Sequence, residues 1–408
     1  MKILHIGSPI TDFMGEFGLI FKVSKGLKDL GHEVTIVTTD ADSFYYDKEK
    51  SQMYSETRKK LLTANKNPVV FNEVPLYALH CTVHKFGFYC PDAKNFARKI
   101  ISDYDVVHVC TWYSHICMVF AQVAFEKNIP FIVSSWGTLL PNARKLKASQ
   151  KWVADQIYTK KILNHATGFQ SVGESERKEF LRLGATPESI YRLDNPVELE
   201  KFEIKEKSDI LNRYNITGKK FLLFLGRINE KKGIEILLEA FVRIVKNQEE
   251  LLLILAGSGT KEYEKSIGKL VKKLGLENNV ILTGLVTENE KLELLKSASL
   301  FVLTSHSDVH PIAVQDALTM GTPVIITEIC DYPEVKVYDA GLIVDENINQ
   351  ITDAILNVVN NDERLREMSE NAKRLVLERF QLKIQIKKYD EMYKDVINRF
   401  HEKLLEKI

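Results

Sequence analysis

The sequence predicts an α/β protein built from two doubly wound, Rossmann-like domains in tandem. Its 408 residues exceed the size of one ordinary domain. Apolar runs of strand length alternate with segments of helical spacing, which is typical of parallel sheets covered by helices on both faces. The alternation stops at Asn195–Glu198, before a charged stretch, and resumes at Lys219. We therefore expect domains at 1–200 and 201–380, followed by a C-terminal helix at 381–408.

The elements of the first half follow from apolar periodicity and from glycine breaks. The expected strands are Ile3–Gly7, Val34–Thr38, Asp105–Val109 and Phe131–Ser134, and the expected helices are Gly18–Leu30 and Ile116–Lys127. Such a domain binds its ligands beyond the carboxyl ends of its strands.

The second half repeats the cycle. The expected strands are Lys219–Leu225, Leu251–Ala256, Val280–Thr283, Leu300–Thr304 and Val324–Thr327, and the expected helices are Gly233–Lys246, Lys261–Leu274, Asn289–Ala298 and one that ends near Met320. From Ile386 onward, apolar residues at helical spacing form one stripe along the C-terminal helix. We expect this stripe to pack on the protein's own core.

Composition excludes several classes of protein. The net charge is +1, so no overall field attracts nucleic acid. The five scattered cysteines show no C-x-x-C spacing, which disfavours a disulfide framework or a zinc site and favours a reducing compartment. The longest uncharged run, Val106–Phe125, contains polar residues and is explained by a buried strand and helix. We expect a cytoplasmic protein without a transmembrane segment.

One part of the chain is unevenly charged. Between Arg58 and Lys161 there are fifteen Lys or Arg and six Asp or Glu residues, roughly +9 for the stretch. A solvated face explains this excess. Peripheral contact with an anionic membrane at its inner face, or a lipid-phosphate acceptor, also explains it, and both interpretations stay open.

A first candidate site follows the strand that ends at Leu225. There Gly226-Arg227 precedes a turn that ends in Lys232-Gly233, at the start of a helix. Glycines allow the backbone to approach a ligand closely, Arg can contact two phosphate oxygens, and Lys adds a mobile charge. The motif therefore predicts a diphosphate site.

A second candidate site follows the strand that ends at Thr304. Pro311 is placed as the first residue of a helix, so the backbone amides around it would face an anion. These amides belong to Val309, His310, Ile312 and Ala313. Two acidic residues, Asp308 before the helix and Asp316 within it, are placed to hold hydroxyl groups at the two ends of an elongated ligand.

These motifs, in their order, resemble family 4 of the retaining glycosyltransferases, which have the GT-B fold. The similarity runs through Gly226-Arg227, Lys232-Gly233 and Asp308–Asp316 into Ala317–Ile325, and in the first half through Met14-Gly15, Gly31–Val34, Asp105–His108 and Ser134–Leu139. It covers nearly the whole chain. The resemblance implies two Rossmann-like domains with an interdomain cleft, and a C-terminal helix that returns to the first domain.

The resemblance also implies a role for individual residues. Arg227 and Lys232 correspond to the pair that neutralises the donor diphosphate, and Gly15 to a glycine whose amide approaches the phosphate. Asp308 and Asp316 correspond to the two glutamates of the family's Glu-x7-Glu motif, which contact the transferred sugar and the ribose. The segment expected to hold the base consists of Gly284, Leu285 and Val286.

This chain departs from the family pattern in its sugar-side residues. Both family glutamates are aspartates here, so each carboxylate is one methylene shorter. Trp136 stands where members have His or Arg, and it cannot carry a proton or a positive charge, although it can stack on a sugar. We expect Trp136 and His115 to contact the sugar or the acceptor.

Together these observations predict a metal-independent, retaining glycosyltransferase. It would move a sugar from a nucleotide-diphosphate sugar to a hydroxyl of a glycan or a lipid-linked acceptor, with no cofactor. Asp308, Arg227 and Lys232 are the expected catalytic residues. A nucleotide-sugar epimerase on the same fold and a non-catalytic nucleotide-sugar-binding protein are the alternatives. The alternating His306, Asp308 and His310 could instead hold a metal, although three-ligand sites need further support.

Overall fold

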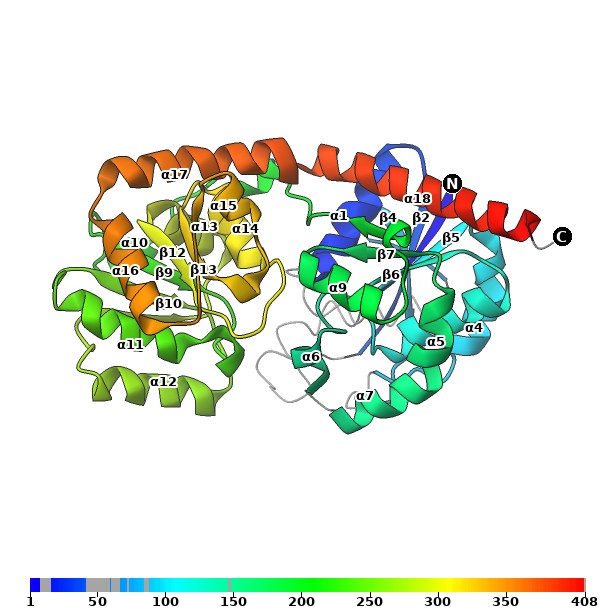
Figure 1. Cartoon of the computed structure of the whole chain (residues 1–408), viewed down its shortest axis with the longest axis horizontal. Coiled ribbons are helices and arrows are strands. Elements are labelled where there is room, and N and C mark those ends of the chain that lie inside the picture. Colours follow the sequence, from blue (N-terminus) through cyan, green and yellow to red (C-terminus); the bar gives the residue numbers. More distant parts are fainter. Residues whose placement is uncertain are drawn as a thin grey trace. The chain divides into compact units, whose positions relative to one another are not determined.

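The structure is a computed structural model that describes residues 1–7, 16–41, 59, 67–71, 73–83, 88–145 and 148–406. The chain divides into two compact units (Figure 1). The first unit consists of Met1–Pro196 and Leu382–Ile408, and the second unit of Val197–Gln381. Each unit has its own parallel sheet and its own apolar core.

The first unit is built on an eight-stranded sheet in the order β3-β4-β2-β1-β5-β6-β7-β8. All neighbouring strands are parallel except β3 and β4. The strands are β1 Lys2–Gly7, β2 Glu33–Thr39, β3 Val69–Phe71, β4 Val74–Leu79, β5 Val106–Cys110, β6 Phe131–Ser134, β7 Gly168–Ser171 and β8 Ile190–Arg192. The chain leaves β1 toward one edge and returns to β5 on its other side, so the topology switches between β1 and β5.

Helices cover this sheet. They are α1 Glu16–Asp29, α4 Ala93–Ile100, α5 His115–Glu126, α6 Pro141–Lys145, α7 Ala148–Ala154, α8 Lys160–Ile162, α9 Glu174–Arg182 and α18 Leu382–Leu405. A π-helical turn, Asp155–Thr159, joins α7 to α8. The apolar character of α5 on all its sides explains why it is buried along nearly its whole length.

The C-terminal helix α18 belongs to the first unit, against which its apolar stripe packs. Its residues Tyr389, Met392, Tyr393 and Val396 share a core cluster with Ile3, Val34 and Val106 of the first strands. The Tyr393 hydroxyl also lies 2.8 Å from Nε2 of His5 on β1 and 2.6 Å from Nδ1 of His108 on β5. The hydroxyl has one hydrogen, so it donates to one ring and accepts from the other.

The second unit is built on a six-stranded parallel sheet in the order β11-β10-β9-β12-β13-β14. The strands are β9 Phe221–Leu225, β10 Leu252–Ala256, β11 Val280–Gly284, β12 Leu300–Leu303, β13 Val324–Thr327 and β14 Gly341–Val344. The chain runs from β9 outward to β11 and then returns to β12, beside β9. The topology therefore switches between β9 and β12, the place where open parallel sheets bind ligands.

The helices of the second unit connect these strands. They are α10 Ile210–Arg213, α11 Ile234–Val245, α12 Lys261–Lys273, α13 Glu288–Ser297, α14 Ile312–Thr319, α15 Glu334–Val337, α16 Ile348–Val359 and α17 Asp362–Leu375. A short 3-10 turn, Glu230–Lys232, precedes α11, and a π-helical turn, Val376–Phe380, follows α17.

The predicted fold class is confirmed, with two parallel-sheet α/β units. Every strand and helix that the sequence predicts is present, and those with stated bounds end within about two residues of them, except that the C-terminal helix ends at Leu405 rather than 408. All five cysteines are free and buried. Among the described helices, none is both long and apolar enough to cross a bilayer.

Candidate functional site

The loops that follow β9 and β12 lie next to each other at the switch point of the second sheet. The two strands pair directly, with Leu222 opposite Leu300 and Leu223 opposite Phe301. Both candidate motifs of the second half begin where these strands end. The fold therefore brings Gly226–Gly233 and Asp308–Asp316 to one edge of one sheet.

Glycines let the backbones at this edge approach closely. Gly257, at φ +133°, lies so near Gly226 that an added Cβ would stand 1.8 Å from the Gly226 carbonyl oxygen. An added Cβ on Gly259 would likewise stand 1.9 Å from the Ile228 carbonyl oxygen. The Gly226 amide donates to the carbonyl of Ala256 at 3.0 Å. These glycines hold the loop after β9 against the loop after β10, which gives the edge a fixed backbone shape.

Gly233 fixes the start of α11 against the loop after β12. It adopts a left-handed conformation with φ +62°, and an added Cβ would stand 2.0 Å from the Thr304 carbonyl oxygen. The Thr304 hydroxyl donates to the Gly233 carbonyl at 2.7 Å. The neighbouring residue, Lys232, is thereby placed over the ends of β9 and β12.

Lys232 joins the two candidate motifs. Its ammonium group forms an ion pair with Asp308 Oδ2, and its Cε lies 4.0 Å from the position of a Cβ on Gly226. The Ser305 hydroxyl donates to the same Asp308 oxygen at 3.2 Å. The side chains of Lys232 and Asp308 are 17% and 20% exposed, so the pair is shielded from water but still reachable by a ligand.

Arg227 lies on the loop between Gly226 and Lys232. Its side chain is exposed. Within the part of the chain that the structure describes, it makes no hydrogen bond or ion pair. Its guanidinium group is therefore available to an anion that approaches the loop.

A second ion pair lies on α14, one turn and a half into the helix. Asp316 Oδ2 accepts a hydrogen bond from Lys291 on α13 at 3.0 Å, and Lys291 also contacts Glu288 at 2.7 Å. Burial acts to lower the pKa of Lys291, but the neighbouring Asp316 and Glu288 outweigh it, so the pKa is raised. Lys291 thus stays charged and fixes the orientation of the Asp316 carboxylate.

The start of α14 differs in part from the sequence prediction. The helix begins at Ile312 after Pro311, and its first amides, on Ile312 and Ala313, have no carbonyl partner within the helix. The amide of His310, however, donates to the Cys330 carbonyl at 3.0 Å. The expectation of an available His310 amide is therefore wrong. Val309 is partly exposed beside it.

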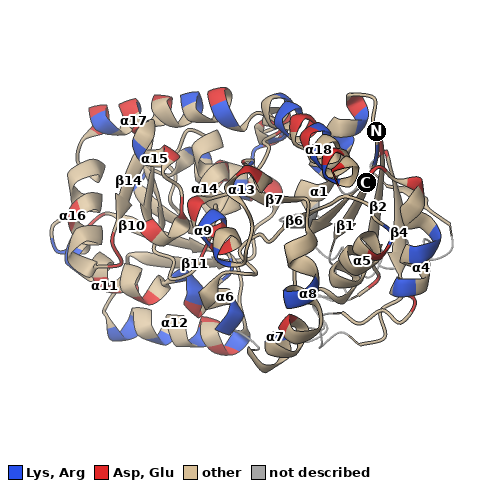
Figure 2. Cartoon of the chain, turned by 45° about the vertical axis from the view of Figure 1, so that its right-hand side comes forward, with Lys and Arg blue, Asp and Glu red and all other residues tan. Residues whose placement is uncertain are grey.

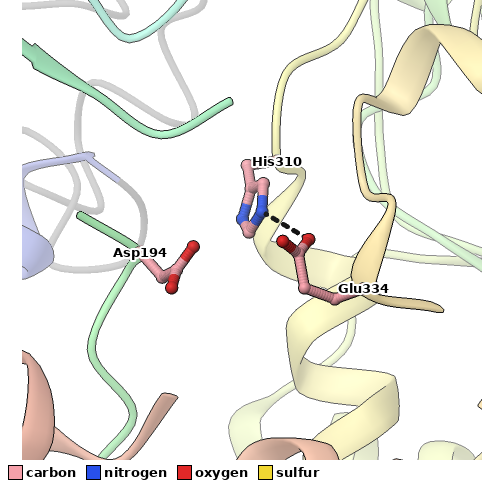
Figure 3. Close-up of side chains that lie close together, drawn as sticks. All are labelled: Asp194, His310 and Glu334. Atoms are coloured by element: carbon pink, nitrogen blue, oxygen red, sulfur yellow. Dashed lines mark ion pairs between the residues drawn. The ribbon is translucent and has the colours of Figure 1, made fainter. Parts of the chain in front are cut away.

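The imidazole of His310 is buried rather than presented at the edge. It stacks on Tyr332, with ring centroids 3.7 Å apart, and its Nε2 lies 3.5 Å from Glu334 Oε2 (Figure 3). Arg379 contacts the other oxygen of Glu334 at 3.0 Å. Asp194, also drawn in Figure 3, belongs to the first unit. His310 therefore supports the turn before α14 from inside the second unit.

The segment expected to hold the base follows β11. Gly284 adopts φ +69°, and its carbonyl accepts from the Gly257 amide at 2.9 Å. Leu285 is 61% exposed, and Val286 packs against the core of the unit. The loop thus presents one exposed apolar side chain beside the loop that follows β10.

The metal-site hypothesis for the alternating residues does not fit the geometry. His306 pairs with Glu346 at 2.7 Å, Asp308 with Lys232, and His310 with Glu334. The three side chains therefore have three different sets of partners within the second unit and do not share a ligand position.

In the first unit, Trp136 lies in the turn that follows β6. Its backbone is left-handed, with φ +42°, which is unfavourable for a bulky residue. Glu176 of α9 holds this turn, because its buried carboxylate accepts from the Ser135 hydroxyl at 2.5 Å, the Gly137 amide at 2.7 Å and the Val172 amide at 2.9 Å. The indole ring is partly buried against a core cluster, and no described residue accepts a hydrogen bond from its N–H.

The loop after β5 contains two more residues with strained backbone and leads to a histidine at the start of α5. Thr111 and Tyr113 have φ of +107° and +55°, and such strain clusters at functional sites. His115 starts α5, and its Nδ1 accepts from the Cys90 amide at 3.3 Å. Burial lowers the pKa of His115, so the ring is neutral near pH 7.

Comparison with known families decides what kind of enzyme this is. The model for glycosyl transferases group 1 matches residues 206–375, and the model for Glycosyltransferase Family 4 matches residues 19–201. The two matches fall on the second and the first unit, in the order expected of a GT-B enzyme, and together they cover most of the chain.

The chain belongs to glycosyltransferase family 4.

Relatives of this glycosyltransferase have diverged widely in sequence. The N-acetyl-alpha-D-glucosaminyl L-malate synthase of Bacillus anthracis is 22% identical over 409 residues, covering 97% of each chain. The alpha-monoglucosyldiacylglycerol synthase of Streptococcus pneumoniae is 32% identical over 135 residues, which are 32% of this chain and 30% of that protein. The structure of Anabaena Alr3699/HepE in complex with UDP and glucose is similar with a TM-score of 0.76 and 16% identity, and the alignment covers 97% of this chain and all of that one. This structural similarity supports the GT-B fold.

Two residues that contact the candidate site residues are absent from the sequence prediction. They are Lys291, which pairs with Asp316, and Glu176, which holds the Trp136 turn. Each lies on a different helix from its partner, so no local spacing indicates the contact. A capping box at Thr287 and Glu290 does mark the start of α13 and hence the position of Lys291. Gly15, a predicted donor residue, lies outside the described residues.

Proposed function

We propose that this glycosyltransferase moves a sugar from a nucleoside-diphosphate sugar to a hydroxyl group with retention of configuration and without a metal ion. The donor would bind at the carboxyl edge of the second sheet. The acceptor would bind at the carboxyl edge of the first. The roles of the two units and of the individual residues are part of this proposal.

The Lys232–Asp308 pair carries the proposal. An ammonium group held over the ends of β9 and β12, beside a glycine that admits close approach, suits the diphosphate of a donor. Exposed Arg227 adds a second cation on the same loop. When the sugar leaves, negative charge grows on the departing diphosphate, and fixed positive charges stabilise it more than they stabilise the bound donor. Lys232 and Arg227 can therefore supply the electrostatic role that a metal has in other transferases.

Asp308 is proposed to position the pair and the sugar rather than to attack the anomeric carbon. One of its oxygens is already engaged by Lys232 and Ser305. A carboxylate held in this way is a weaker nucleophile, while its second oxygen can still accept a hydrogen bond from a sugar hydroxyl. We therefore infer that the acceptor attacks from the face that the diphosphate leaves, and that the leaving phosphate takes the acceptor proton.

Asp316 is proposed to hold the ribose. Its carboxylate is one methylene shorter than the family's glutamate, and Lys291 fixes its orientation at 3.0 Å. The exposed Leu285 and partly buried Val286 would contact the base. The first amides of α14, on Ile312 and Ala313, would contact the phosphate.

The acceptor is proposed to be a glycan or a lipid-linked hydroxyl compound. The strained residues Thr111, Tyr113 and Trp136 follow β5 and β6, where the first sheet would receive a ligand. The relatives include both an L-malate synthase and a monoglucosyldiacylglycerol synthase, so acceptors vary within this family. His115 and Trp136 are proposed to contact the acceptor or the sugar.

Calorimetry with the Lys232→Ala variant tests the diphosphate site. We expect nucleoside diphosphates to bind at least about a hundredfold more weakly to the variant, since it loses a shielded cation, while nucleosides bind almost as before. Lys231→Ala is the matched control, because Lys231 is the adjacent exposed lysine of the same turn. Equal losses for diphosphate and nucleoside would contradict the proposal.

Two further measurements test the reaction itself. Transfer should continue in excess EDTA, and NMR of the product should show the anomeric configuration of the donor. Loss of activity with EDTA that Mg²⁺ restores would refute the metal-free mechanism. An inverted product would refute retention.

A further inference from the structure

Three large apolar side chains are exposed together after β6 in the first unit. Trp152 is 63% exposed, Val153 48% and Ile157 52%. They lie on α7 and on the π-helical turn that follows it. Large apolar residues that gather in this way on a surface mark a binding face.

The π-helical turn brings the exposed residues closer to one side of the helix. In a regular α-helix, positions 152 and 157 would be rotated by about 140° from each other, because each residue adds about 100°. The π-helical turn Asp155–Thr159 is wider, so each of its residues adds less than 100° and Ile157 is rotated less far from Trp152 than in a regular α-helix. The same turn directs Asp155 and Thr159 inward, where they are 6% and 4% exposed.

Positive charge surrounds this face. From Lys127 to Gly173 the sequence holds seven Lys or Arg and a single acidic residue, Asp155. That carboxylate is buried and paired with Arg144 and Tyr113, so its charge is not presented at the surface. Lys145, Lys160 and Lys161 are exposed. Figure 2 shows Lys and Arg in blue on α6 and α8. The only contact of the Lys160 ammonium group among the described residues is the neutral Gln156 side chain, at 3.0 Å.

This surface adjoins the proposed acceptor edge. The segment from α6 to α8 follows β6 and the Trp136 turn, so it continues from the carboxyl end of the first sheet. Lys151, between Trp152 and α6, lies over the ring of Tyr113 from the loop after β5, 5.0 Å from its centroid. Whatever binds the exposed face is therefore held close to the loops after β5 and β6.

We propose that Trp152, Val153, Ile157, Lys160 and Lys161 form a docking face for an anionic lipid bilayer. A tryptophan with aliphatic neighbours enters the headgroup region of a membrane, and lysines beside it contact lipid phosphates. Nucleic acid would use the charge but not the aliphatic side chains. A second copy of this chain would bring the same lysines against each other, a like-charge contact that opposes pairing.

Docking would present a lipid-linked acceptor to the first sheet directly from the bilayer. This consequence rests on the proposed function, whereas the docking itself does not. The two are separable, because Lys232→Ala should abolish transfer and leave membrane binding unchanged.

Vesicle co-sedimentation tests the docking face. We expect the protein to sediment with vesicles of phosphatidylcholine and phosphatidylglycerol in equal parts, but not with phosphatidylcholine alone, and to be released by high salt. Lys160→Glu with Lys161→Glu should lower the partition coefficient by at least about 25-fold, from about fivefold for each lysine. Trp152→Ser with Ile157→Ser should lower it by about tenfold or more.

Matched variants on the second unit serve as controls. Val337→Ser removes an apolar side chain that is 78% exposed, and Lys272→Glu with Lys273→Glu reverses two charges on the exposed side of α12. Neither should change sedimentation with vesicles, and all variants should keep the thermal transition of the parent protein. Binding that is unchanged in the Trp152 and Lys160 variants would overturn the proposal. So would a monomer–dimer shift in sedimentation velocity caused by Trp152→Ser with no loss of vesicle binding.

Discussion

The carboxyl edges of the two sheets are built in different ways. The edge of the second sheet carries two shielded ion pairs, Lys232 with Asp308 and Lys291 with Asp316, on a backbone fixed by glycines. The edge of the first sheet carries aromatic residues in strained turns, such as Tyr113 and Trp136, and buried carboxylates hold these turns. A charged, rigid edge suits a ligand part common to all donors, the diphosphate and ribose. An edge of aromatic residues held by side chains can change with the acceptor.

The largest expected effect concerns the backbone of the second edge. Gly257→Ala would place a Cβ 1.8 Å from the Gly226 carbonyl oxygen at a residue with φ +133°. We expect a loss of about 4 kcal/mol in the free energy of unfolding, because backbone atoms must move apart. Urea unfolding followed by circular dichroism measures it.

Gly268→Ala is the matched control for that variant. Gly268 lies within α12, and an added Cβ meets nothing within 4 Å. We expect the free energy of unfolding of this variant to rise by about 0.5–1 kcal/mol, since alanine favours a helix. A Gly257→Ala protein as stable as the parent would show that the second edge does not depend on close backbone approach.

The next largest effect is the loss of stability of the first unit in acid. Burial lowers the pKa of His5 to about 3, and burial together with His5 lowers that of His108. The unfolded chain binds protons below about pH 6.5 that the folded histidines do not, so stability falls as the pH drops from 6.5 toward 3. Each histidine should lower the free energy of unfolding by about 2 kcal/mol between pH 7 and pH 5.

Tryptophan fluorescence follows this acid effect in the first unit. All three tryptophans, Trp112, Trp136 and Trp152, lie there. The corresponding central strands of the second sheet, β9 and β12, contain only Phe, Leu and Val and have nothing to titrate. His5→Gln should make the pH dependence shallower, whereas His401→Gln, at an exposed position, should not. An unchanged pH dependence in His5→Gln would count against the buried pair.

A smaller effect on ligand binding distinguishes the roles of the two ion pairs at the edge of the second sheet. Lys291→Met keeps the length of the side chain but removes the charge that orients Asp316. We expect about tenfold weaker binding of nucleosides and of nucleoside diphosphates alike, because the ribose contact is shared by both. Lys296→Met, at an exposed position of the same helix, is the control. A loss confined to the diphosphate would place Lys291 at the phosphates instead.

The smallest effect concerns the first edge. Trp136→Phe keeps an aromatic ring but removes the indole N–H, which no described residue accepts. We expect the acceptor KM to rise about threefold to fivefold while the donor KM stays unchanged. Steady-state kinetics with each substrate varied in turn measures both. A rise in the donor KM alone would move Trp136 to the donor side of the reaction.

Much of the fold could be predicted because its strands are buried on both faces. Runs such as Phe221–Leu225 and Leu252–Ala256 are apolar throughout, which marks parallel strands in the sequence. The strand Gly168–Ser171 was not predicted. Its Gln170 is polar and buried, and it accepts from Ser134 on the neighbouring strand, a partner that local pattern does not reveal.

The sequence indicates which candidate residues come together where they lie in loops that follow neighbouring strands. Gly226, Lys232 and Asp308 lie in the loops after β9 and β12, and the sheet order brings these loops together. The contacts that decide orientation join distant segments: Lys291 reaches Asp316, and Glu176 reaches the Trp136 turn. The same limit explains the error at His310, since its amide is taken by Cys330 from the loop after β13.

The position of Tyr393 between His5 and His108 has a consequence for biosynthesis. The second unit is one continuous stretch, Val197–Gln381, and its whole sequence has left the ribosome before α18 is complete. The first unit reaches its full packing only once α18 is made, because β1 and β5 share a hydroxyl from this helix, which follows the whole second unit in the chain. During synthesis from the N-terminus, the second unit can therefore complete its fold before the first unit does.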